Sequence, residues 1–325
     1  MPLYNKEQYV ERAIASVLSQ HCADSQHPFT YQLIVVDDGS TDHSAAVAAR
    51  CIEGHPHCQL VSQTNAGVSA ARNKGVSLAT GRYVCFLDAD DWWEPDFLQQ
   101  IDRLTALCPD AGTYCTGYYL VKSGNRRKAP IGVDSQFEAG YIDYCRTYSR
   151  TLCMPVTSSS VAVRRDCFEA VGGFDEGLSF GEDFHLWIRL ALNYPVALVN
   201  QPLANYFQDL PAGKRATRRL HDPQRHMLWH LDTMAEAEHN RKEVKRLFDQ
   251  LRSGGLYRHY LSRQYHDTTL PEIAKIDWTP LPARAKRKYE TPLWQARARF
   301  ALNEFGASCK QALLSAAAAC KHRKK

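Results

Sequence analysis

Residues 83–98 read YVCFLDADDWWEPDFL, and this stretch decides the fold. The run Tyr83–Leu87 is short and apolar, as a buried strand would be. Three carboxylates follow within four positions, at Asp88, Asp90 and Asp91. The pattern then changes to a helical period over about residues 95–107. A buried strand that ends in polar residues and passes into a helix is the repeating unit of a layered α/β protein.

The same alternation extends upstream of this stretch. Strands are expected at 31–36 and 58–62, and helices at 10–18, from 44 and at 68–78. This alternation predicts an α/β fold with a mostly parallel central sheet flanked by helices. Ligands of open α/β sheets bind beyond the carboxyl ends of the strands. Because Asp37 and Asp38 follow the first of these strands, two carboxylate clusters are expected to face one crevice.

The composition and the charge suggest two regions of different character. The chain has 325 residues, of which 44% are apolar and 23% charged, and a domain commonly holds ~150 residues. Residues 1–209 carry 16 Lys and Arg against 24 Asp and Glu, whereas residues 210–325 carry 24 against 11. Strand-like runs also stop near residue 205. We expect one domain over residues 1–208 and a basic, mainly helical region over residues 209–325.

The basic region is expected to consist of long polar helices, over about residues 221–251, 256–266 and 293–320. Three residues of the first helix are expected to be surface histidines, namely His221, His226 and His230. The last helix ends in KHRKK and has an apolar face made of Ala301, Phe305, Ala312, Leu313 and Ala316. This pattern fits docking on an anionic membrane surface. The alternatives are a solvated basic tail and a partner-binding helix; no nucleic acid is expected, since no recognised binding module accompanies the basic residues.

The sequence indicates a cytoplasmic protein, with peripheral attachment to the inner face of the cell membrane as an option of the basic tail. No apolar run approaches the ~18 residues that a bilayer-spanning helix needs. The amino terminus, MPLYNKEQYV, lacks the pattern of a secretory signal. The 11 cysteines contain no C-x-x-C pair, which suits a reducing compartment.

The acidic strand end at residues 88–91 suits a divalent cation. The chain contains no G-x-x-x-x-G-K-[ST] motif, and no G-x-G-x-x-G motif follows the early strands. A hard ion such as Mg²⁺ or Mn²⁺ needs one or two carboxylates together with phosphate oxygens. Asp88 and Asp90 would share one face of an extended segment. The alternative is that these acids cap the next helix, and Asp91 suits that role.

Four segments in register resemble the signature segments of one enzyme family. They are MPLYNKEQYVERAIASVLSQ (1–20), LIVVDDGSTDHS (33–44), QTNAGVSAARNKGVSLATGRYVCFLDADDWWEPDFL (63–98) and GGFDEGLSFGEDFHLWIRLA (172–191). Over about residues 2–195 the chain resembles inverting glycosyltransferase family 2, which has the GT-A fold. The resemblance implies a transferase that uses a nucleotide-sugar donor and a divalent cation.

The resemblance also implies roles for individual residues. The positions beside the nucleotide and the diphosphate are Pro2, Tyr4, Asn5, Asn65, Gly67, Arg72 and Asn73. The acid that contacts the uracil base matches Asp38, with Asp37 as the alternative. The D-x-D element matches Asp88, Ala89 and Asp90, with the first carboxylate near the ribose and the second, Asp90, on the metal ion.

On the opposite side of the sugar, the resemblance places the acids Glu182 and Asp183, with Asp183 as the base. An activated sugar needs stabilisation of the departing diphosphate and deprotonation of an acceptor hydroxyl. One base opposite one leaving group implies a single displacement with inversion. The alternative for Glu182 is an acidic helix start. Three aromatic residues are candidates either to stack on a sugar or to belong to the core, namely Trp92, Trp93 and Phe180.

One departure from the family pattern concerns the first strand. The family begins with an apolar strand in the middle of the sheet, whereas only Met1 precedes the P-x-Y-N segment here. A gap at that place would leave backbone groups of both neighbouring strands unpaired. We therefore expect a truncated first central strand, and we hypothesise that Met1 is an internal residue of a longer protein.

The expected function is transfer of a sugar, from a UDP-linked donor in the first instance, to a saccharide or lipid-linked acceptor during surface polysaccharide biosynthesis. A sugar nucleotidyltransferase is one alternative, although MPLYNKE is not the Gly-rich first loop that such an enzyme would show. The other is a non-catalytic nucleotide-sugar-binding or scaffold protein derived from the family.

Overall fold

The computed structural model describes residues 1–20, 30–209 and 219–303. By its internal contacts the chain divides into two compact units, residues 1–247 and 248–325. Every strand of the described residues lies in the first unit. The predicted boundary between residues 208 and 209 adjoins residues outside the described ranges and stays a prediction.

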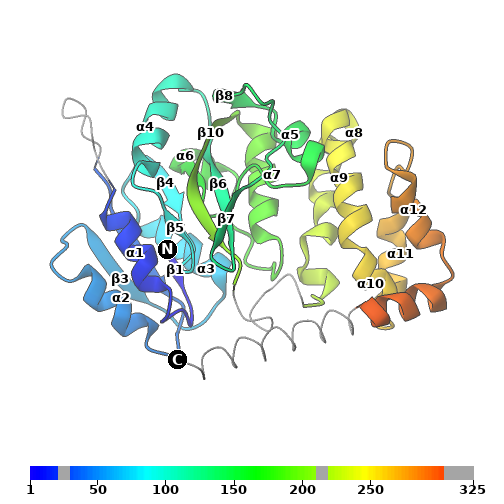
Figure 1. The fold of residues 1–325 in the computed structure, drawn as a ribbon, viewed down its shortest axis with the longest axis horizontal. Coiled ribbons are helices and arrows are strands. Elements are labelled where there is room, and N and C mark those ends of the chain that lie inside the picture. The colour runs from blue at the N-terminus through cyan, green and yellow to red at the C-terminus, as the bar shows by residue number, and fades with distance from the viewer. Residues whose placement is uncertain (21–29, 210–218, 304–325) are drawn as a thin grey trace. The chain divides into compact units, whose positions relative to one another are not determined.

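The amino-terminal part of the first unit is a three-stranded parallel sheet in the order β1-β2-β3 (Figure 1). Its strands are β1 (Pro2–Leu3), β2 (Leu33–Asp37) and β3 (Cys58–Ser62), and its helices are α1 (Val10–Leu18), α2 (Ser44–Ile52) and α3 (Val68–Leu78). All five residues of β2 are buried, which explains why its first four residues, LIVV, are all apolar instead of alternating. The strands and helices predicted upstream of residue 80 are confirmed.

The larger sheet has seven strands and mixed pairing. Its strands in spatial order are β4 (Tyr83–Phe86), β9 (Val161–Arg164), β6 (Thr113–Lys122), β10 (Val196–Phe207) and β5 (Trp92–Trp93), with β7 (Asn125–Lys128) on β6 and β8 (Ala139–Ile142) on β10. Only β6 and β10 pair in parallel within this sheet. The tight reversal at Ser123 and Gly124, both with positive φ, makes β7 antiparallel to β6, and β4, β5, β8 and β9 also pair in antiparallel fashion. The central sheet is therefore more mixed than the predicted, mostly parallel one.

Helices cover the larger sheet on both sides, as Figure 1 shows for α4 and α7. The helices are α4 (Phe97–Leu107), α5 (Tyr144–Thr151), α6 (Arg165–Ala170) and α7 (Glu182–Asn193). The ring of Phe86 on β4 lies 5.9 Å from that of Phe168, 5.2 Å from that of Phe174 and 6.0 Å from that of Trp187. This aromatic cluster fixes α6 and α7 against the strand that carries the acidic segment.

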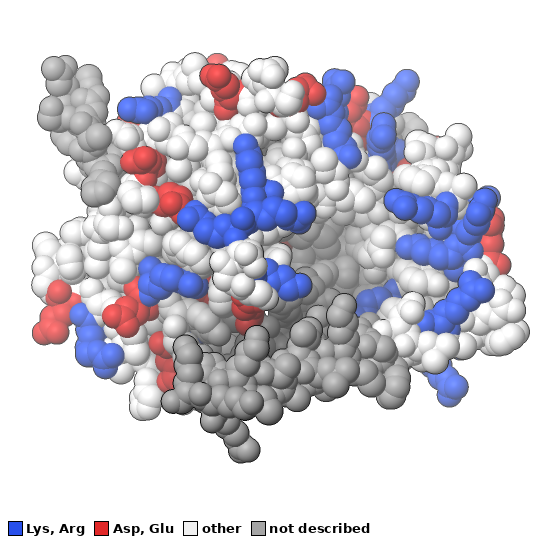
Figure 2. Space-filling view, viewed as in Figure 1, with Lys and Arg blue, Asp and Glu red and all other residues white. Residues whose placement is uncertain are grey.

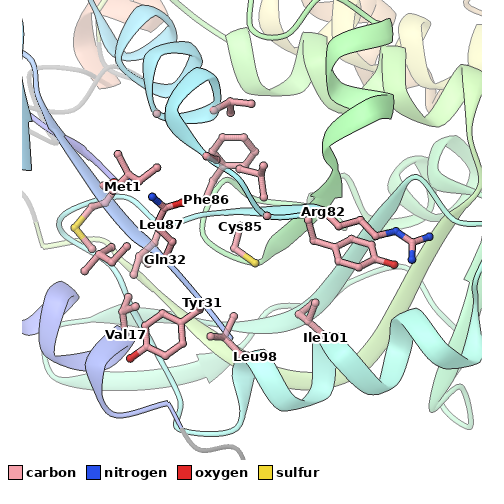
Figure 3. A pocket seen from close by; sticks show the side chains of 18 of the residues that line it. Met1, Val17, Tyr31, Gln32, Arg82, Cys85, Phe86, Leu87, Leu98 and Ile101 are labelled. Carbon is pink, nitrogen blue, oxygen red and sulfur yellow. Dashed lines mark hydrogen bonds between the residues drawn. The ribbon is translucent and has the colours of Figure 1, made fainter. Parts of the chain in front are cut away.

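The first strand is as short as the sequence predicts. β1 contains Pro2 and Leu3 and pairs with β2 alone. A cavity of about 520 Å³ lies between β2 and β4, and Figure 3 shows Met1, Gln32 and Cys85 among the side chains around it. The two sheets are therefore not joined by strand pairing among the described residues, and other contacts must hold them together.

The segment after residue 219 differs from the predicted single helix over 221–251. It forms three 3₁₀ turns (Pro223–Arg225, Met227–Trp229 and Leu231–Met234) before α8 (Ala235–Asn240) and α9 (Lys242–Gly255). The expectation of surface histidines is wrong for His226, which is 5% exposed. The turns let this segment follow the loop before α7, where Met227 donates its N–H to the carbonyl of Phe180.

The second unit is built from short helices, α10 (Tyr257–Leu261), α11 (His266–Ala274) and α12 (Ala283–Glu290), followed by a helical stretch over 293–303. The predicted helix over 256–266 is wrong, because the chain turns between α10 and α11. Figure 2 shows Lys and Arg gathered in the region of α12, whose sequence ARAKRKYE contains two of each. Most of the predicted apolar face of the last helix lies outside the described residues. No helix in the described part of the chain is both long and apolar enough to cross a bilayer.

A buried hydrogen bond between the loop before β9 and the acidic segment after β4 gives a first prediction. Ser159 donates its hydroxyl to Asp91 Oδ2 at 2.6 Å and accepts the N–H of Asp88 at 3.1 Å. Ser159→Ala is expected to lower the free energy of unfolding by about 2 kcal/mol, because a buried carboxyl group loses its donor. Urea denaturation measures the loss.

The matched control for this prediction is Ser158→Ala. Ser158 is buried like Ser159, but its hydroxyl has no hydrogen-bond partner among the described residues. Its removal should leave the free energy of unfolding nearly unchanged. Equal losses in the two variants would contradict the importance of the Asp91 contact.

Candidate active site

A pocket of about 650 Å³ lies where the strands of both sheets end. Its wall combines residues from the ends of β1, β2, β4 and β10 and from the start of α3 and α7. The residues that line it are Pro2, Leu3, Tyr4, Lys6, Asp38, Asn65, Gly67, Val68, Ala71, Arg72, Asp88, Ala89, Asp90, Glu182, Tyr206, Phe207 and Gln208. Its volume is in the ordinary range for small-molecule sites.

The loops that follow β1 and β2 are joined by a series of hydrogen bonds. Asn5 adopts a left-handed conformation with φ of 51°, and its Oδ1 accepts the N–H of Thr41 at 2.8 Å. The N–H of Lys6 donates to Ser44 Oγ at 2.7 Å. Glu7 accepts the N–H of His43 at 3.0 Å. These bonds give the segment YNKE a fixed backbone beside the pocket.

Asp38 holds the loop that leads into α3. Its carboxylate accepts the side-chain amide of Gln63 at 2.8 Å and the N–H groups of Ala66 and Gly67 at 2.8 and 2.9 Å. Asn65 donates its side-chain amide to the carbonyl of Asp38 at 2.8 Å. Asp38 is only 3% exposed, so the carboxylate shapes the pocket wall through this loop.

Arg72 joins the donor side of the pocket to the acidic start of α7. Its guanidinium donates to Asp88 Oδ1 at 2.7 Å and to Glu182 Oε1 at 3.1 Å, and its side chain is 4% exposed. Burial lowers the pKa of Arg72, but the nearby carboxylates of Asp88, Glu182 and Asp183 outweigh burial and raise the pKa. The guanidinium is therefore permanently charged and committed to two carboxylates.

The acidic segment after β4 points its three carboxylates to different partners. Asp88 contacts Arg72 and Asp90 Oδ2 contacts Lys6 Nζ at 2.6 Å, and both acids line the pocket. Asp91 turns into the protein and accepts the N–H of Phe207 at 2.8 Å. Burial and the neighbouring acids raise the pKa of Asp91 well above its usual range. Asp91 is thus a structural residue that attaches the end of β10 to the acidic segment.

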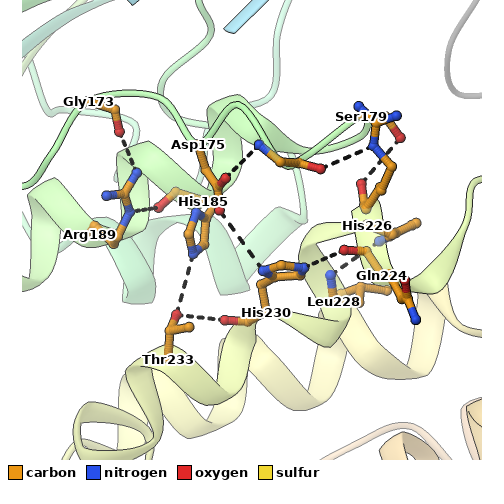
Figure 4. Close-up of polar contacts among 12 residues, drawn as sticks. Gly173, Asp175, Ser179, His185, Arg189, Gln224, His226, Leu228, His230 and Thr233 are labelled. Carbon is orange, nitrogen blue, oxygen red and sulfur yellow. Dashed lines mark hydrogen bonds and ion pairs between the residues drawn. The ribbon is translucent and has the colours of Figure 1, made fainter.

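The loop before Glu182 is held on two sides. Asn73 on α3 donates to the carbonyl of Phe174 at 2.9 Å and accepts its N–H at 3.0 Å. From α7, Arg189 donates to the carbonyl of Gly173 at 2.6 Å, and Figure 4 shows this bond beside the contact of Asp175 with His230 at 4.0 Å. These contacts determine where α7, and with it Asp183, begins.

Asp183 is the titrating group of this site. It is half-buried in the first turn of α7 and accepts the N–H of Phe184 at 2.8 Å. Burial, and then the nearby carboxylate of Glu182, raise the pKa of Asp183 to about 7, although Arg72 opposes the shift. A carboxylate with such a pKa accepts a proton near neutral pH, which is the property of a general base.

The structure brings most of the predicted donor-site residues into one pocket. The predicted residues that line it are Pro2, Tyr4, Asp38, Asn65, Gly67, Arg72, Asp88, Ala89, Asp90 and Glu182. Four other predicted residues have different surroundings. Asp37 accepts the N–H of Ser40, Asn5 and Asn73 fix loops, and Asp183 lies next to the lining residue Glu182.

The three predicted aromatic residues do not line the pocket. Trp93 stacks on Phe97 at 4.1 Å and donates its Nε1–H to the carbonyl of Ser159, so it belongs to the core. The Arg12 guanidinium lies 3.7 Å over the Trp92 ring. Phe180 stacks on His221 at 4.6 Å.

Sequence reasoning missed Lys6, the last two residues of β10, Tyr206 and Phe207, and Gln208 directly after them. The rule that ligands bind at the carboxyl ends of strands would have found the last three, since β10 runs parallel to β6. No pattern in the sequence distinguishes Lys6 as a site residue, because a single lysine next to a family motif is usually a surface residue.

The chain has the fold of the GT-A transferases, and this fold defines the class of protein. TarS of S. aureus, solved as residues 1–349 in complex with UDP-GlcNAc, superposes with a TM-score of 0.67 over 91% of this chain and 86% of that chain, at 17% identity. The mannosyltransferase PcManGT from Pyrobaculum calidifontis, in complex with GDP-Man and Mn²⁺, superposes with a TM-score of 0.51 over 94% of this chain and 78% of that chain, at 21% identity.

The particular family follows from the sequence. The family described as Glycosyl transferase family 2 matches residues 1–171, more than half of the chain, and the protein belongs to this family. A curated relative, the amylovoran biosynthesis glycosyltransferase AmsB of Erwinia amylovora, is 31% identical over 218 residues, which cover 63% of this chain and 67% of AmsB. Two further curated relatives are matched over only 25% and 14% of their own length.

The double ion pair of Arg72 yields a prediction about stability. Arg72→Met keeps the length of the side chain but leaves Asp88 and Glu182 without their cation. Removing one partner of a buried ion pair costs about 3–5 kcal/mol, so we expect a loss near the lower value because Asp88 is partly exposed. Urea denaturation measures it, and a loss below about 1 kcal/mol, the size of a surface ion pair, would contradict the prediction.

Proposed function

We propose that this glycosyltransferase transfers a sugar from a UDP-linked donor to a saccharide or lipid-linked acceptor, with inversion, and serves surface polysaccharide biosynthesis. The observation that carries the proposal is that Asp88, Asp90, Arg72 and Glu182 line a single pocket, with Asp183 next to Glu182 in the first turn of α7. An activated sugar needs these two functions, leaving-group stabilisation and a base, on opposite sides.

The donor side of the proposal rests on shape and on comparison. The pocket is lined by the loop ends at Tyr4, Asn65 and Gly67, and Gly67 has no side chain that would keep a flat base or a ribose from the backbone. TarS, whose fold is similar, is described in complex with UDP-GlcNAc. We extend this donor class to the present chain, with UDP as the nucleotide to test first.

The oxygen atoms that line this site suit a divalent cation. Asp88 and Asp90 provide hard oxygen atoms, which Mg²⁺ and Mn²⁺ prefer, and diphosphate oxygens can fill further positions. The lining also carries four carboxylates (Asp38, Asp88, Asp90 and Glu182) against two cationic side chains, so a diphosphate needs additional positive charge. In the proposal Asp90 holds the ion, which would neutralise the charge of the departing diphosphate.

The acceptor side of the proposal assigns the proton transfer to Asp183. Its raised pKa makes the carboxylate basic enough to take the proton of an acceptor hydroxyl near pH 7. A single displacement opposite the leaving group inverts the anomeric configuration. Glu182 is held by Arg72 and serves to position the start of α7.

The donor and metal assignments lead to a binding prediction. At about 100 times its dissociation constant, UDP with Mn²⁺ is expected to raise the melting temperature by about 5 °C, because a ligand of the folded state stabilises it. The shift should disappear in Asp90→Asn. Asp110→Asn, which changes an exposed acid away from the pocket, should keep the full shift. A wild-type chain that shows no shift with UDP or any other nucleoside diphosphate would refute the proposal.

The assignment of the base leads to a prediction about activity. Asp183→Asn should lower the transfer rate by about 10²–10⁴-fold and leave the UDP–Mn²⁺ melting shift intact. In the wild type the rate should fall about tenfold per pH unit below pH 7, since the base must be unprotonated. Progress curves with an acceptor panel and a pH profile measure both, and an unchanged rate in Asp183→Asn would exclude Asp183 as the base.

The same substitution has an expected effect on stability. Because the pKa of Asp183 is raised in the folded protein, ionisation destabilises the fold as the pH rises from about 4 to about 7. Asp183→Asn should therefore melt higher than the wild type at pH 8. At pH 4 the two proteins should differ little.

A further inference from the structure

The carboxylate proposed to hold a divalent cation is already paired with a cation of the protein. Lys6 Nζ lies 2.6 Å from Asp90 Oδ2, and the two side chains are 22% and 12% exposed. Arg12 donates to the backbone carbonyl of Asp90 at 2.8 Å, which fixes the acid from the other side. A divalent cation that binds Asp90 must therefore compete with the ammonium group of Lys6.

The backbone of Lys6 is fixed, but its side chain has room to move. The hydrogen bonds of Asn5, Lys6 and Glu7 to the 40–44 loop hold the main chain at this place. The ammonium group lies on a flexible four-carbon stem inside the pocket wall. A short swing of the stem can take the charge from Asp90 to a ligand without any movement of the backbone.

Of the two cationic side chains that line the pocket, Lys6 is the one that a diphosphate can reach. The cationic side chains in the lining are Lys6 and Arg72. Arg72 is 4% exposed and donates to two carboxylates, whereas Lys6 is 22% exposed and contacts one. A diphosphate entering this acidic pocket therefore meets the ammonium group of Lys6 first.

We propose that Lys6 is an exchangeable counter-cation that couples diphosphate binding to metal binding. In the empty site its ammonium neutralises Asp90. When the donor binds, the ammonium moves to a diphosphate oxygen and leaves the carboxylate of Asp90 to the divalent cation. This inference rests on the proposed function, because it takes the ligand to be a nucleoside diphosphate and Asp90 to be the metal ligand.

The exchange has a thermodynamic consequence. Without a diphosphate, a divalent cation must displace the ammonium from a mostly buried carboxylate, so its affinity is low. With a diphosphate, the ammonium has a second anion to bind, and the displacement costs less. Coupling between two ligands is reciprocal, so Lys6 also raises the affinity for the diphosphate most when the metal ion is present.

The experiment titrates Mn²⁺ into the full chain, with free Mn²⁺ followed by its paramagnetic resonance signal, in the absence and presence of saturating UDP. Lys6→Met removes the charge and keeps the length of the side chain. In this variant Mn²⁺ alone should bind about tenfold more tightly than in the wild type, and the factor by which UDP improves Mn²⁺ binding should fall about fivefold. UDP alone should bind more weakly.

Two further variants control this result. Lys275→Met removes a lysine that lies at the same distance, 2.6 Å, from a buried glutamate, Glu272, outside the pocket, and it should behave as the wild type. The double variant Lys6→Met with Asp90→Asn should lose the gain in Mn²⁺ affinity. Lys6→Arg, which keeps the charge, should retain the low affinity and tests the inference even if Lys6→Met fails to fold.

The outcomes separate this inference from the proposed function. A chain that binds UDP and Mn²⁺, but whose Mn²⁺ affinity is the same in Lys6→Met, overturns the exchange and leaves the transferase assignment standing. A well-folded wild type that binds neither UDP nor Mn²⁺ contradicts the proposed function itself. A Lys6→Arg variant that binds Mn²⁺ alone tenfold more tightly than the wild type would also overturn the exchange.

Discussion

The guanidinium of Arg72 connects the three segments on which the site depends. It extends from α3, contacts Asp88 at the end of β4 and reaches Glu182 at the start of α7. Because the group is buried and always charged, neither acid can be moved without leaving a buried charge unpaired. Together with the contacts of Asn73 and Arg189 that hold the loop before α7, this side chain sets the distance between Asp88 and the proposed base. Burial is the main cause of the raised pKa of Asp183; the carboxylates of Glu182 and Asp88 add to it, and Arg72 opposes it.

Polar contacts connect the two sheets of the first unit in place of strand pairing. The two sheets share no strand pairing among the described residues, and a cavity lies between β2 and β4. The acidic segment is joined to α1 through Arg12, to β10 through Asp91 and to the first loop through Lys6. All three contacts involve residues 90 and 91. The segment DADD thus links the two halves of the site as well as lining it, which explains why only part of it is available to a ligand.

The sequence predicted the elements up to residue 107 well, because strand and helix periods alternate clearly there and each apolar run is followed by a helix of its own. The prediction from the sequence failed where the hydrophobic periods are short or absent. The 3₁₀ turns between residues 223 and 234 have the composition of a polar helix, and only their packing on the loop before α7 shows why the chain turns. The mixed pairing of the larger sheet could not be predicted from the sequence for a similar reason. The direction in which its strands pair depends on contacts among β4, β9 and β6, and these strands are far apart in the chain.

The sequence by itself determined the family, the alternation of strands and helices and the identity of the acids that line the pocket. These depend on local patterns, because a motif is carried by neighbouring residues and a strand end by the residue that follows it. Only the tertiary structure decided what each acid does. Asp38 holds a loop, Asp91 anchors a strand, Asp88 is paired with Arg72 and Asp90 with Lys6. The four acids have the same chemistry in the sequence. They differ in the structure because the partner and the burial of a carboxylate are set by segments up to 116 residues away, and these set its charge and its availability to a ligand.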